Sequence, residues 1–318
     1  MYKAENLSKS YISKRKFSQL LKKRDKKKVL NNVNLNIEKG KVIGLLGLNG
    51  AGKTSLIKIL TTISSYDSGK IYCDDMVVTP KNKIEVRKKI NLITGGERNL
   101  YWRLSGYENL RYFGTLYNIK ALDERIDEVL SIVGLTDSKN IPVEKYSKGM
   151  KQRLQIAKGL INNPEYLFLD EPTLGLDVHI SKEIRTYIRK LSEDYNKGVL
   201  ITSHILEEIE EICDYVYVLN RGEIISEGSI ADILMEFKKE HSFKITLHSK
   251  REMEILKEIM DQESYSYDIC SENTINILTL ENNELELHRI IRENNLNIMY
   301  FIHKPPKLED IIMEIERR

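Results

Sequence analysis

The chain has 318 residues, enough for two domains, and its 41% hydrophobic and 31% charged residues are typical of a globular protein with a substantial core. It has no apolar run near the ~18 residues of a membrane-spanning helix, no signal-peptide pattern at its start, and only three scattered cysteines. These features exclude a disulfide framework and a membrane span, and we expect a reduced, cytosolic setting.

Charge is distributed unevenly along the chain, although the net charge is only +3. Residues 1–28 hold eleven Lys or Arg against Glu5 and Asp25, a local charge of +9, which leaves −6 for the remainder. A chain whose larger part is acidic lacks the basic surface of a general nucleic-acid binder. We therefore expect no nucleic-acid partner.

The first 230 residues alternate short apolar, β-rich runs with helical patterns. This alternation predicts an α/β fold with a largely parallel core sheet. Core strands are expected at 41–46, 167–169, 199–202 and 215–219, a strand of a smaller antiparallel sheet at 68–72, and helical structure at 54–60 and from 108 to 130. A turn at residues 220–222 ends the last strand, and we assign residues 1–230 to one domain.

The pattern changes after about residue 240, where strands and helices follow in the order βαββαβ. The expected strands are 242–249, 265–271, 274–280 and 297–303, the expected helices are 251–260 and 284–293, and a last helix covers 308–315. This order predicts a small ferredoxin-like α+β domain. We assign residues 241–318 to it.

The segment Gly47–Thr54 fits the phosphate-loop pattern and stands between a predicted strand and a predicted helix. Its glycines let backbone N–H groups turn inward around phosphates. The Lys53 ammonium reaches the β- and γ-phosphates, and the Thr54 hydroxyl is placed for Mg²⁺. The alternative is a glycine-rich turn without a ligand, and the strand–loop–helix context favours the nucleotide.

Two acids, Asp170 and Glu171, follow the apolar run 166–169, and ligands of open α/β sheets bind at such strand ends. The first carboxylate can hold Mg²⁺ through water, and the second can orient or deprotonate an attacking water. A strand that ends in solvated acids is the alternative for an isolated pair. The segment Pro172–Asp177 follows at once and favours the functional interpretation.

The segment Tyr146–Arg153 lies between the phosphate loop and the acidic pair, and it is the most informative motif. Ser147 and Gly149 at the start of a helix form an anion-binding end. The phosphate loop already holds its own nucleotide. We therefore infer that this second anion-binding end serves a nucleotide held by another copy of the chain.

His204 follows the predicted strand 199–202 directly. A lone histidine is more often a packed or solvated residue than a catalyst. At a strand end beside a phosphate site, it can donate a hydrogen bond to a γ-phosphate. The other five histidines have no comparable setting.

Taken in order, these motifs resemble the ATP-binding subunits of ABC transporters over residues 1 to about 230. The resemblance implies a P-loop ATPase domain with a parallel core sheet, an antiparallel β subdomain and a helical subdomain. It also implies ATP and Mg²⁺ as cofactors. Glu171 corresponds to the general base, His204 to the switch histidine, and Asp177 to the loop that links two sites.

The resemblance also implies which residues bind ATP and metal. Ser147 and Gly149 belong to the signature loop, which completes the ATP site of a partner subunit. Tyr11 matches the aromatic residue that stacks on adenine, a contact of ~1 kcal/mol; taken alone, it is a core or surface tyrosine. The implied cofactor-binding residues are Tyr11, Gly47, Asn49, Gly50, Ala51, Gly52, Lys53, Thr54, Ser55, Ser147, Gly149 and Asp177, and the implied metal-binding residues are Thr54 and Asp170.

Two further segments, residues 95–104 and 306–310, are similar to the drug- and daunorubicin-resistance type of ABC ATPase, an ABC-2 exporter type whose permease is a separate membrane protein. The C-terminal domain fits that group. The chain departs from the family pattern at three positions. Gly96, followed by Glu97, occupies the place of a Gln that touches Mg²⁺ and the permease, Lys148 replaces a Gly, and Met150 replaces a Gln.

A basic insert within residues 12–28 separates Tyr11 from the strand expected at Val29. Phe17, Leu20 and Leu21 fall at helical spacing among Lys and Arg, which is consistent with a short basic amphipathic helix. The alternative is a solvated loop. In the first case the insert contacts anionic lipid headgroups or acidic permease loops, at about 1 kcal/mol per Lys.

We expect an ATP-hydrolysing subunit of an ABC-type membrane exporter, bound peripherally at the cytoplasmic face of the cell membrane. Two copies form a homodimer around two ATP molecules and drive a separate transmembrane permease. One alternative is a soluble ABC-type ATPase with a non-transport role. Another is a GTPase or a small-molecule kinase, but the Asn-Lys-x-Asp guanine motif is absent and the signature segment is then unexplained.

Overall fold

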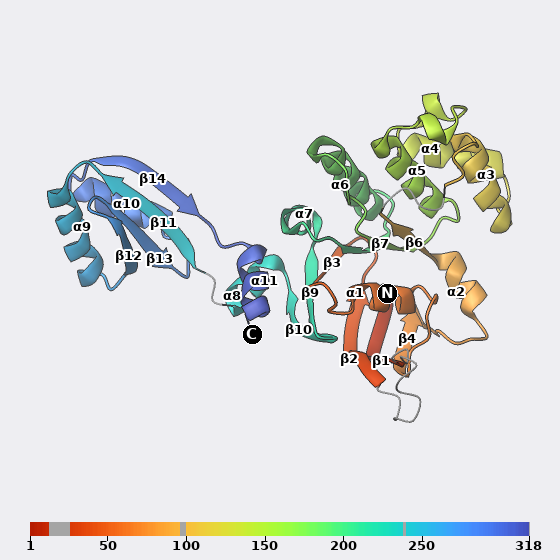
Figure 1. Ribbon diagram of the computed structural model, residues 1–318, viewed down its shortest axis with the longest axis horizontal. Coiled ribbons are helices and arrows are strands. Elements are labelled where there is room, and N and C mark those ends of the chain that lie inside the picture. The colour runs from red at the N-terminus through yellow and green to blue at the C-terminus, as the bar shows by residue number, and fades with distance from the viewer. Residues whose placement is uncertain (13–25, 96–99, 238–239, 318) are drawn as a thin grey trace, which may run out of the picture. The chain divides into compact units, whose positions relative to one another are not determined.

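A computed structural model describes residues 1–12, 26–95, 100–237 and 240–317. The chain divides into two compact units, Met1–Ser229 and Ile230–Arg318 (Figure 1). No helix in the described ranges is long and apolar enough to cross a membrane.

The first unit is built on a six-stranded sheet in the order β10-β9-β3-β8-β7-β6. All neighbouring strands are parallel except β10, which pairs with β9 as an antiparallel hairpin. The strands are β3 (Val42–Leu46), β6 (Ile90–Thr94), β7 (Tyr166–Asp170), β8 (Gly198–Thr202), β9 (Tyr215–Asn220) and β10 (Glu223–Gly228). Every residue of β3 and β8 is buried, as expected for parallel strands covered on both faces. The predicted core strands are confirmed.

A second, antiparallel sheet has the order β2-β1-β4-β5. Its strands are β1 (Tyr2–Ile12), β2 (Lys26–Ile37), β4 (Ser68–Cys73) and β5 (Met76–Val77). The two sheets share a core in which the Tyr2 ring lies 5.4 Å from the rings of Tyr166 and Phe168, between centroids. This packing joins the antiparallel sheet to the parallel one.

The boundary of the basic insert was predicted too late in the chain. β2 begins at Lys26 rather than Val29, because residues 26–28 pair with residues 10–12 of β1. Backbone hydrogen bonds across this ladder form whatever the side-chain charge, so they outweigh the low strand propensity of lysine. The rest of the insert, with Phe17, Leu20 and Leu21, lies outside the described residues.

The helices of the first unit are α1 (Lys53–Leu60), α2 (Lys83–Lys89), α3 (Gly106–Leu116), α4 (Leu122–Ile132), α5 (Lys148–Leu160), α6 (Val178–Glu193) and α7 (Leu206–Ile212). Helices α3, α4 and α5 pack on one another and form a helical subdomain. The helical stretch expected from 108 to 130 is divided between α3 and α4. Asn118 and Ala121 adopt left-handed φ values of 52° and 51°, which end one helix before the next begins.

The second unit contains the predicted βαββαβ order. Its antiparallel sheet runs β12-β13-β11-β14, the strand order of a ferredoxin-like fold. The strands are β11 (His241–Leu247), β12 (Ser266–Ser271), β13 (Thr274–Thr279) and β14 (Ile298–Lys304), and the helices are α9 (Lys250–Gln262) and α10 (Glu284–Glu293). Helices α8 (Ile230–Glu236) and α11 (Leu308–Arg317) contact each other, so the ferredoxin-like part is inserted between them in the chain.

Candidate functional site

A cavity of about 300 Å³ lies where the phosphate loop faces the carboxyl end of β7. It is lined by Val29, Leu48, Asn49, Gly50, Gly52, Lys53, Thr54, Ser55, Asp170 and Glu171. Most of the residues predicted to bind phosphate and metal therefore line one cavity. Sequence reasoning missed Val29, whose strand reaches the cavity from the antiparallel sheet.

The loop before α1 follows a path that side chains would block. Gly47 has a φ of 152°, and a Cβ at this position would lie 2.2 Å from the Leu219 carbonyl oxygen. Gly52, with a φ of 116°, precedes α1 and supplies no side chain to cap it. The first N–H groups of a helix have no partner within the helix, and a phosphate can accept hydrogen bonds from them.

The Lys53 side chain folds back over this loop. Its ammonium donates hydrogen bonds to the carbonyl oxygens of Gly47 and Leu48. Burial lowers the pKa of Lys53, while the negative charges of Glu171 and Asp170 act in the opposite direction. A partly desolvated ammonium between carbonyl oxygens and carboxylates is suited to receive the added negative charge of a polyphosphate.

Thr202, at the end of β8, holds both acids in place. Its hydroxyl donates to Asp170 Oδ1 at 2.8 Å, and its hydroxyl and carbonyl oxygens accept from the Glu171 N–H at 3.2 and 3.1 Å. Glu171 has a left-handed φ of 51°, uncommon outside glycine, so surrounding contacts must hold it there. Thr202 was not predicted, although it ends the strand that pairs with β7.

His204 lies near the acidic pair but is not among the described residues that line the cavity. Its Nδ1 atom lies 3.7 Å from Glu171 Oε2, and its side chain is 51% exposed. The structure therefore brings the predicted base and the predicted switch histidine together. A half-exposed ring beside a carboxylate is free to contact a ligand.

The signature residues occupy a different place in the unit. Ser147 caps α5, where its hydroxyl accepts a hydrogen bond from the Met150 N–H at 3.2 Å. Gly149 is buried against Ile180, and neither Ser147 nor Gly149 lines the cavity. Asp177 caps α6 in the same manner through the Ile180 N–H, at 2.9 Å.

Tyr11 stands at the end of β1, opposite Lys27 in β2. It is 40% exposed, and the Lys9 ammonium lies 5.4 Å from its ring centroid, which is within the range of a cation–π contact. Tyr11 does not line the cavity, so its contact with adenine stays a prediction. Gly96 and Glu97 lie outside the described residues.

The donor atoms at the cavity suit Mg²⁺. Thr54 and Asp170 offer a hydroxyl and a carboxylate, the hard oxygen ligands that Mg²⁺ accepts together with substrate phosphates and water. Within the described ranges, no three His, Cys, Asp or Glu side chains form a metal cage. The donors therefore fit a metal that binds with its nucleotide.

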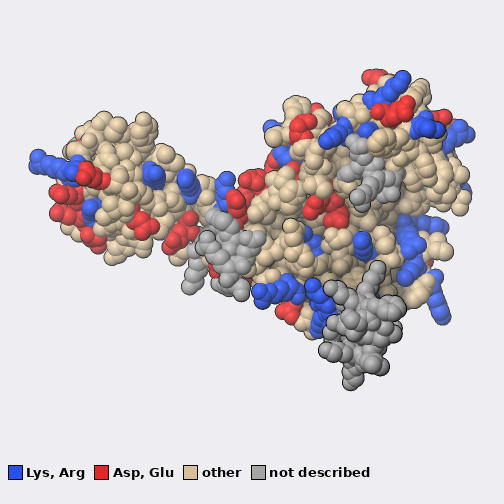
Figure 2. Space-filling view, viewed as in Figure 1, with Lys and Arg blue, Asp and Glu red and all other residues tan. Residues whose placement is uncertain are grey.

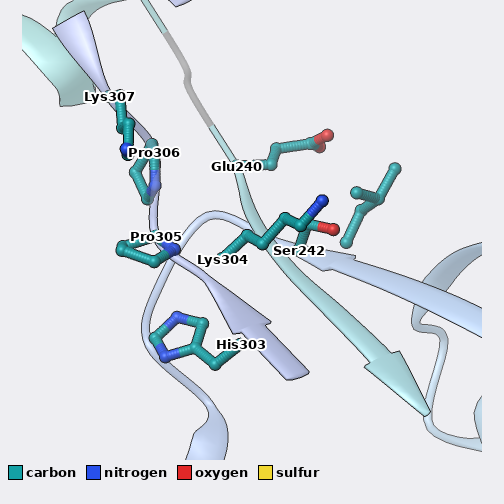
Figure 3. A pocket seen from close by; sticks show the side chains of 8 residues that line it. Glu240, Ser242, His303, Lys304, Pro305, Pro306 and Lys307 are labelled. Atoms are coloured by element: carbon teal, nitrogen blue, oxygen red, sulfur yellow. The ribbon is translucent and has the colours of Figure 1, made fainter. Parts of the chain in front are cut away.

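A second hollow, of about 730 Å³, lies in the second unit beside β11 and β14. Figure 3 shows Glu240, Ser242 and Lys304 around the start of β11, and Pro305 and Pro306 along the segment that leaves β14. A carboxylate and an ammonium face the same hollow. None of the predicted site residues lines it.

Comparisons with known proteins place this site in a family. The model of the family described as "ABC transporter" matches residues 30–174. The ABC transporter ATP-binding protein NatA of Bacillus subtilis is 39% identical over 214 residues, which cover 66% of this chain and 86% of NatA. The bacitracin transport ATP-binding protein BcrA of Bacillus licheniformis is 32% identical over 304 residues, or 94% of this chain and 96% of BcrA.

Solved structures agree. The cbiO1 protein from Clostridium perfringens, part of an ABC transporter complex, is 26% identical with a TM-score of 0.64, over 83% of this chain and 98% of cbiO1. A dimeric ATP-binding cassette in a post-hydrolysis state, bound to ADP and Pi, is also 26% identical, with a TM-score of 0.61, over 72% of this chain and 98% of that cassette.

The fold and the cavity thus define a nucleotide-hydrolysing protein of the phosphate-loop class. More narrowly, the chain belongs to the family of ABC transporter ATP-binding proteins. It binds and hydrolyses ATP to power a transporter, and the predicted fold class and enzyme class are confirmed.

Proposed function

We propose that this ATPase drives an ABC-2 exporter of the drug-resistance type, with a separate permease, from the cytoplasmic face of the membrane. The relative BcrA is named for the transport of bacitracin. A second relative, SrtF of Streptococcus pyogenes, is named for the transport of a lantibiotic. BcrA aligns over 94% of this chain, including the second unit. Antibiotic substrates of the kind named for these relatives are therefore favoured.

One observation carries the mechanism: the cavity holds the phosphate loop and the acids, while Ser147 and Gly149 lie outside it. Two copies, related by a twofold axis, then place the α5 start of each chain over the ATP of its partner. Leu174 and Val178, on either side of Asp177, are 48% and 84% exposed. A second copy would cover these apolar side chains.

Within each site, the residues of this chain divide the chemistry. The loop 47–55 and Lys53 hold the phosphates, with Thr54 and Asp170 as the residues that hold Mg²⁺. The metal supplies neutralising charge to the phosphate oxygens. Glu171 accepts a proton from the attacking water, and His204 donates a hydrogen bond to the γ-phosphate.

Three further assignments extend this proposal to the periphery. Tyr11 stacks on adenine. Residues 1–230 form the ATP-binding domain and 241–318 an accessory domain. Lys26–Lys28, at the start of β2, are exposed, and we place contact with anionic lipid headgroups or acidic permease loops there. Figure 2 shows Lys and Arg side chains along the lower edge of the same unit.

The substitution Glu171→Gln tests the core of this proposal. It keeps the shape of the side chain but removes the proton acceptor, so turnover should fall by roughly 10²–10⁴ while ATP affinity is kept. Steady-state phosphate release and the binding of a fluorescent ATP analogue measure the two quantities. Normal turnover in this variant would show that Glu171 is not the base.

A further inference from the structure

Glu208, on α7, is a carboxylate with only 3% of its surface exposed. A buried charge is costly unless it is paired and hydrogen-bonded. Glu208 Oε2 accepts from the Thr173 hydroxyl at 2.6 Å and from the Ser203 hydroxyl at 2.8 Å, and Oε1 lies 3.0 Å from Arg185 Nη1. The carboxylate is thus bound on both oxygens, by residues from three separate segments.

Each of these segments leads to a predicted site residue. Thr173 lies two positions after Glu171, and Ser203 lies directly before His204. Arg185 belongs to α6, where Asp177 caps the helix start through the Ile180 N–H. One carboxylate therefore ties together the loop after β7, the loop after β8 and the body of α6.

The direction of these hydrogen bonds depends on the charge. The Ser203 oxygen accepts from the Ile205 N–H at 3.0 Å, which leaves the hydroxyl hydrogen for Glu208. An ionised carboxylate only accepts, so both hydroxyls donate and both loops are oriented by it. Glu208 does not line the cavity, so it touches neither the phosphates nor the attacking water there.

The loop after β7 needs such support because Glu171 is held in a left-handed conformation. Thr202 fixes the Glu171 N–H, and the Thr173 hydroxyl is fixed by Glu208 two residues later. On the other side of the same carboxylate, Ser203 fixes the backbone at His204. The distance between Glu171 and His204 is therefore set partly by Glu208.

We propose that Glu208 is a positioning residue that holds Glu171 and His204 in their working arrangement without touching ATP. The proposal rests on the function proposed above. A displacement of about 1 Å in a catalytic group can cost about 10²-fold in rate, while ATP binding depends on the phosphate loop, which Glu208 does not touch. Glu208→Ala should thus lower kcat and leave KM and ATP affinity within twofold.

The experiment measures steady-state turnover, ATP affinity and melting temperature for the 318-residue chain. Glu208→Ala is expected to lower kcat by about 10- to 100-fold. Glu207→Gln, on the exposed side of the same helix, is the control and should match the wild type. Thr173→Val removes one hydroxyl that binds Glu208 but keeps the ion pair between Glu208 and Arg185. This variant should therefore fold even where Glu208→Ala does not, and its kcat should be lowered about threefold or more.

A double-variant cycle separates positioning from general damage. Glu208→Ala is repeated in the Glu171→Gln background, where single-turnover rates are compared. If Glu208 acts through Glu171 and His204, the second change should cost clearly less there than in the wild type, because only the His204 part of the effect remains. A full loss in both backgrounds, a parallel rise in KM, or an unchanged kcat in Thr173→Val would overturn the inference. The Glu171→Gln variant alone reports on the proposed function, so the two failures are distinguishable.

Discussion

The starts of helices α1 and α5 carry similar motifs, yet they have different surroundings. Before α1, Gly52 leaves the helix start open, and Asp170 and Glu171 share its cavity. At α5, the Ser147 side chain caps the helix. Asp170 and Glu171 line the phosphate-loop cavity, and Ser147 is not among the residues that line it. A hydroxyl that accepts one bond still carries a hydrogen to donate.

This difference supports the proposal that a single chain holds an incomplete site. The α1 start has the Lys53 charge and the residues proposed as metal ligands and base, so we expect it to bind ATP by itself. The α5 start offers a hydroxyl and a positive helix end, which can only add to a site that already holds phosphate. In the function proposed above, the two starts are complementary halves, and each complete site takes its α1 start from one copy and its α5 start from the other.

The substitution Ser147→Arg should have the largest effect on this comparison. A long cation at the α5 start blocks the approach of the partner's ATP, so turnover should be abolished. The cavity at α1 is untouched, so ATP affinity should stay within twofold of the wild type. Phosphate release and titration with a fluorescent ATP analogue check both parts. A parallel loss of binding would mean that the α5 start serves its own nucleotide.

Mixing two inactive variants sharpens the same comparison. Lys53→Ala removes the ammonium of the phosphate loop, and Ser147→Arg blocks the α5 start. In a mixed dimer, one site keeps Lys53 from one chain and Ser147 from the other. Equal amounts should recover about a quarter of the wild-type turnover if the sites act independently. The absence of any recovery would contradict shared sites.

A smaller effect is expected for Gly149→Ala, which tests packing at the α5 start. The new Cβ would lie 2.8 Å from Ile180 Cγ2, at the helix that Asp177 caps. Overpacking of this kind typically costs about 1–3 kcal/mol of unfolding free energy. Denaturant unfolding measures the loss, and Ile180→Ala in the same chain should restore part of it. If the double variant is as unstable as the single one, this contact does not limit the position.

Most of the residues that line the cavity at α1 could be picked out from the sequence, because they are adjacent in the chain or end a recognisable strand. Residues 47–55 and the pair 170–171 carry their own pattern of glycine, lysine and acids after apolar runs. Thr202 and Glu208 carried no such signal. Each is a common residue type, and each is hydrogen-bonded to a residue about thirty positions away in the chain. These partners come close only because β7 and β8 are neighbours in the sheet.

The same contrast holds for the fold. Strong apolar runs and helical periodicity located the core strands and the βαββαβ order of the second unit. The division between α3 and α4 was missed because it depends on two left-handed residues, and Ala121 is not a residue that sequence patterns associate with that conformation. The start of β2 was missed because charge suggested a loop where strand pairing decided the structure.

The smallest effect is expected at Asp74, which lies in the turn between β4 and β5, away from both helix starts. Burial alone raises the pKa of its carboxyl, but hydrogen bonds from Lys89 and Tyr166, at 2.8 and 2.6 Å, hold that pKa well below its usual range. Because the folded-state pKa is the lower one, the stabilisation is complete above ~3.9, the unfolded value, and is lost as the pH falls below it.

Asp74→Asn should therefore lower the unfolding free energy by about 1–2 kcal/mol at pH 7, with a difference that shrinks as the pH falls below about 4. Asn suits the left-handed φ of 55° at this position, so the change reports on charge rather than on the backbone. Asp75→Asn, at the exposed neighbour, is the control. An Asp74→Asn difference that stayed constant down to pH 3 would show that packing, not the carboxylate charge, stabilises this side of the sheet.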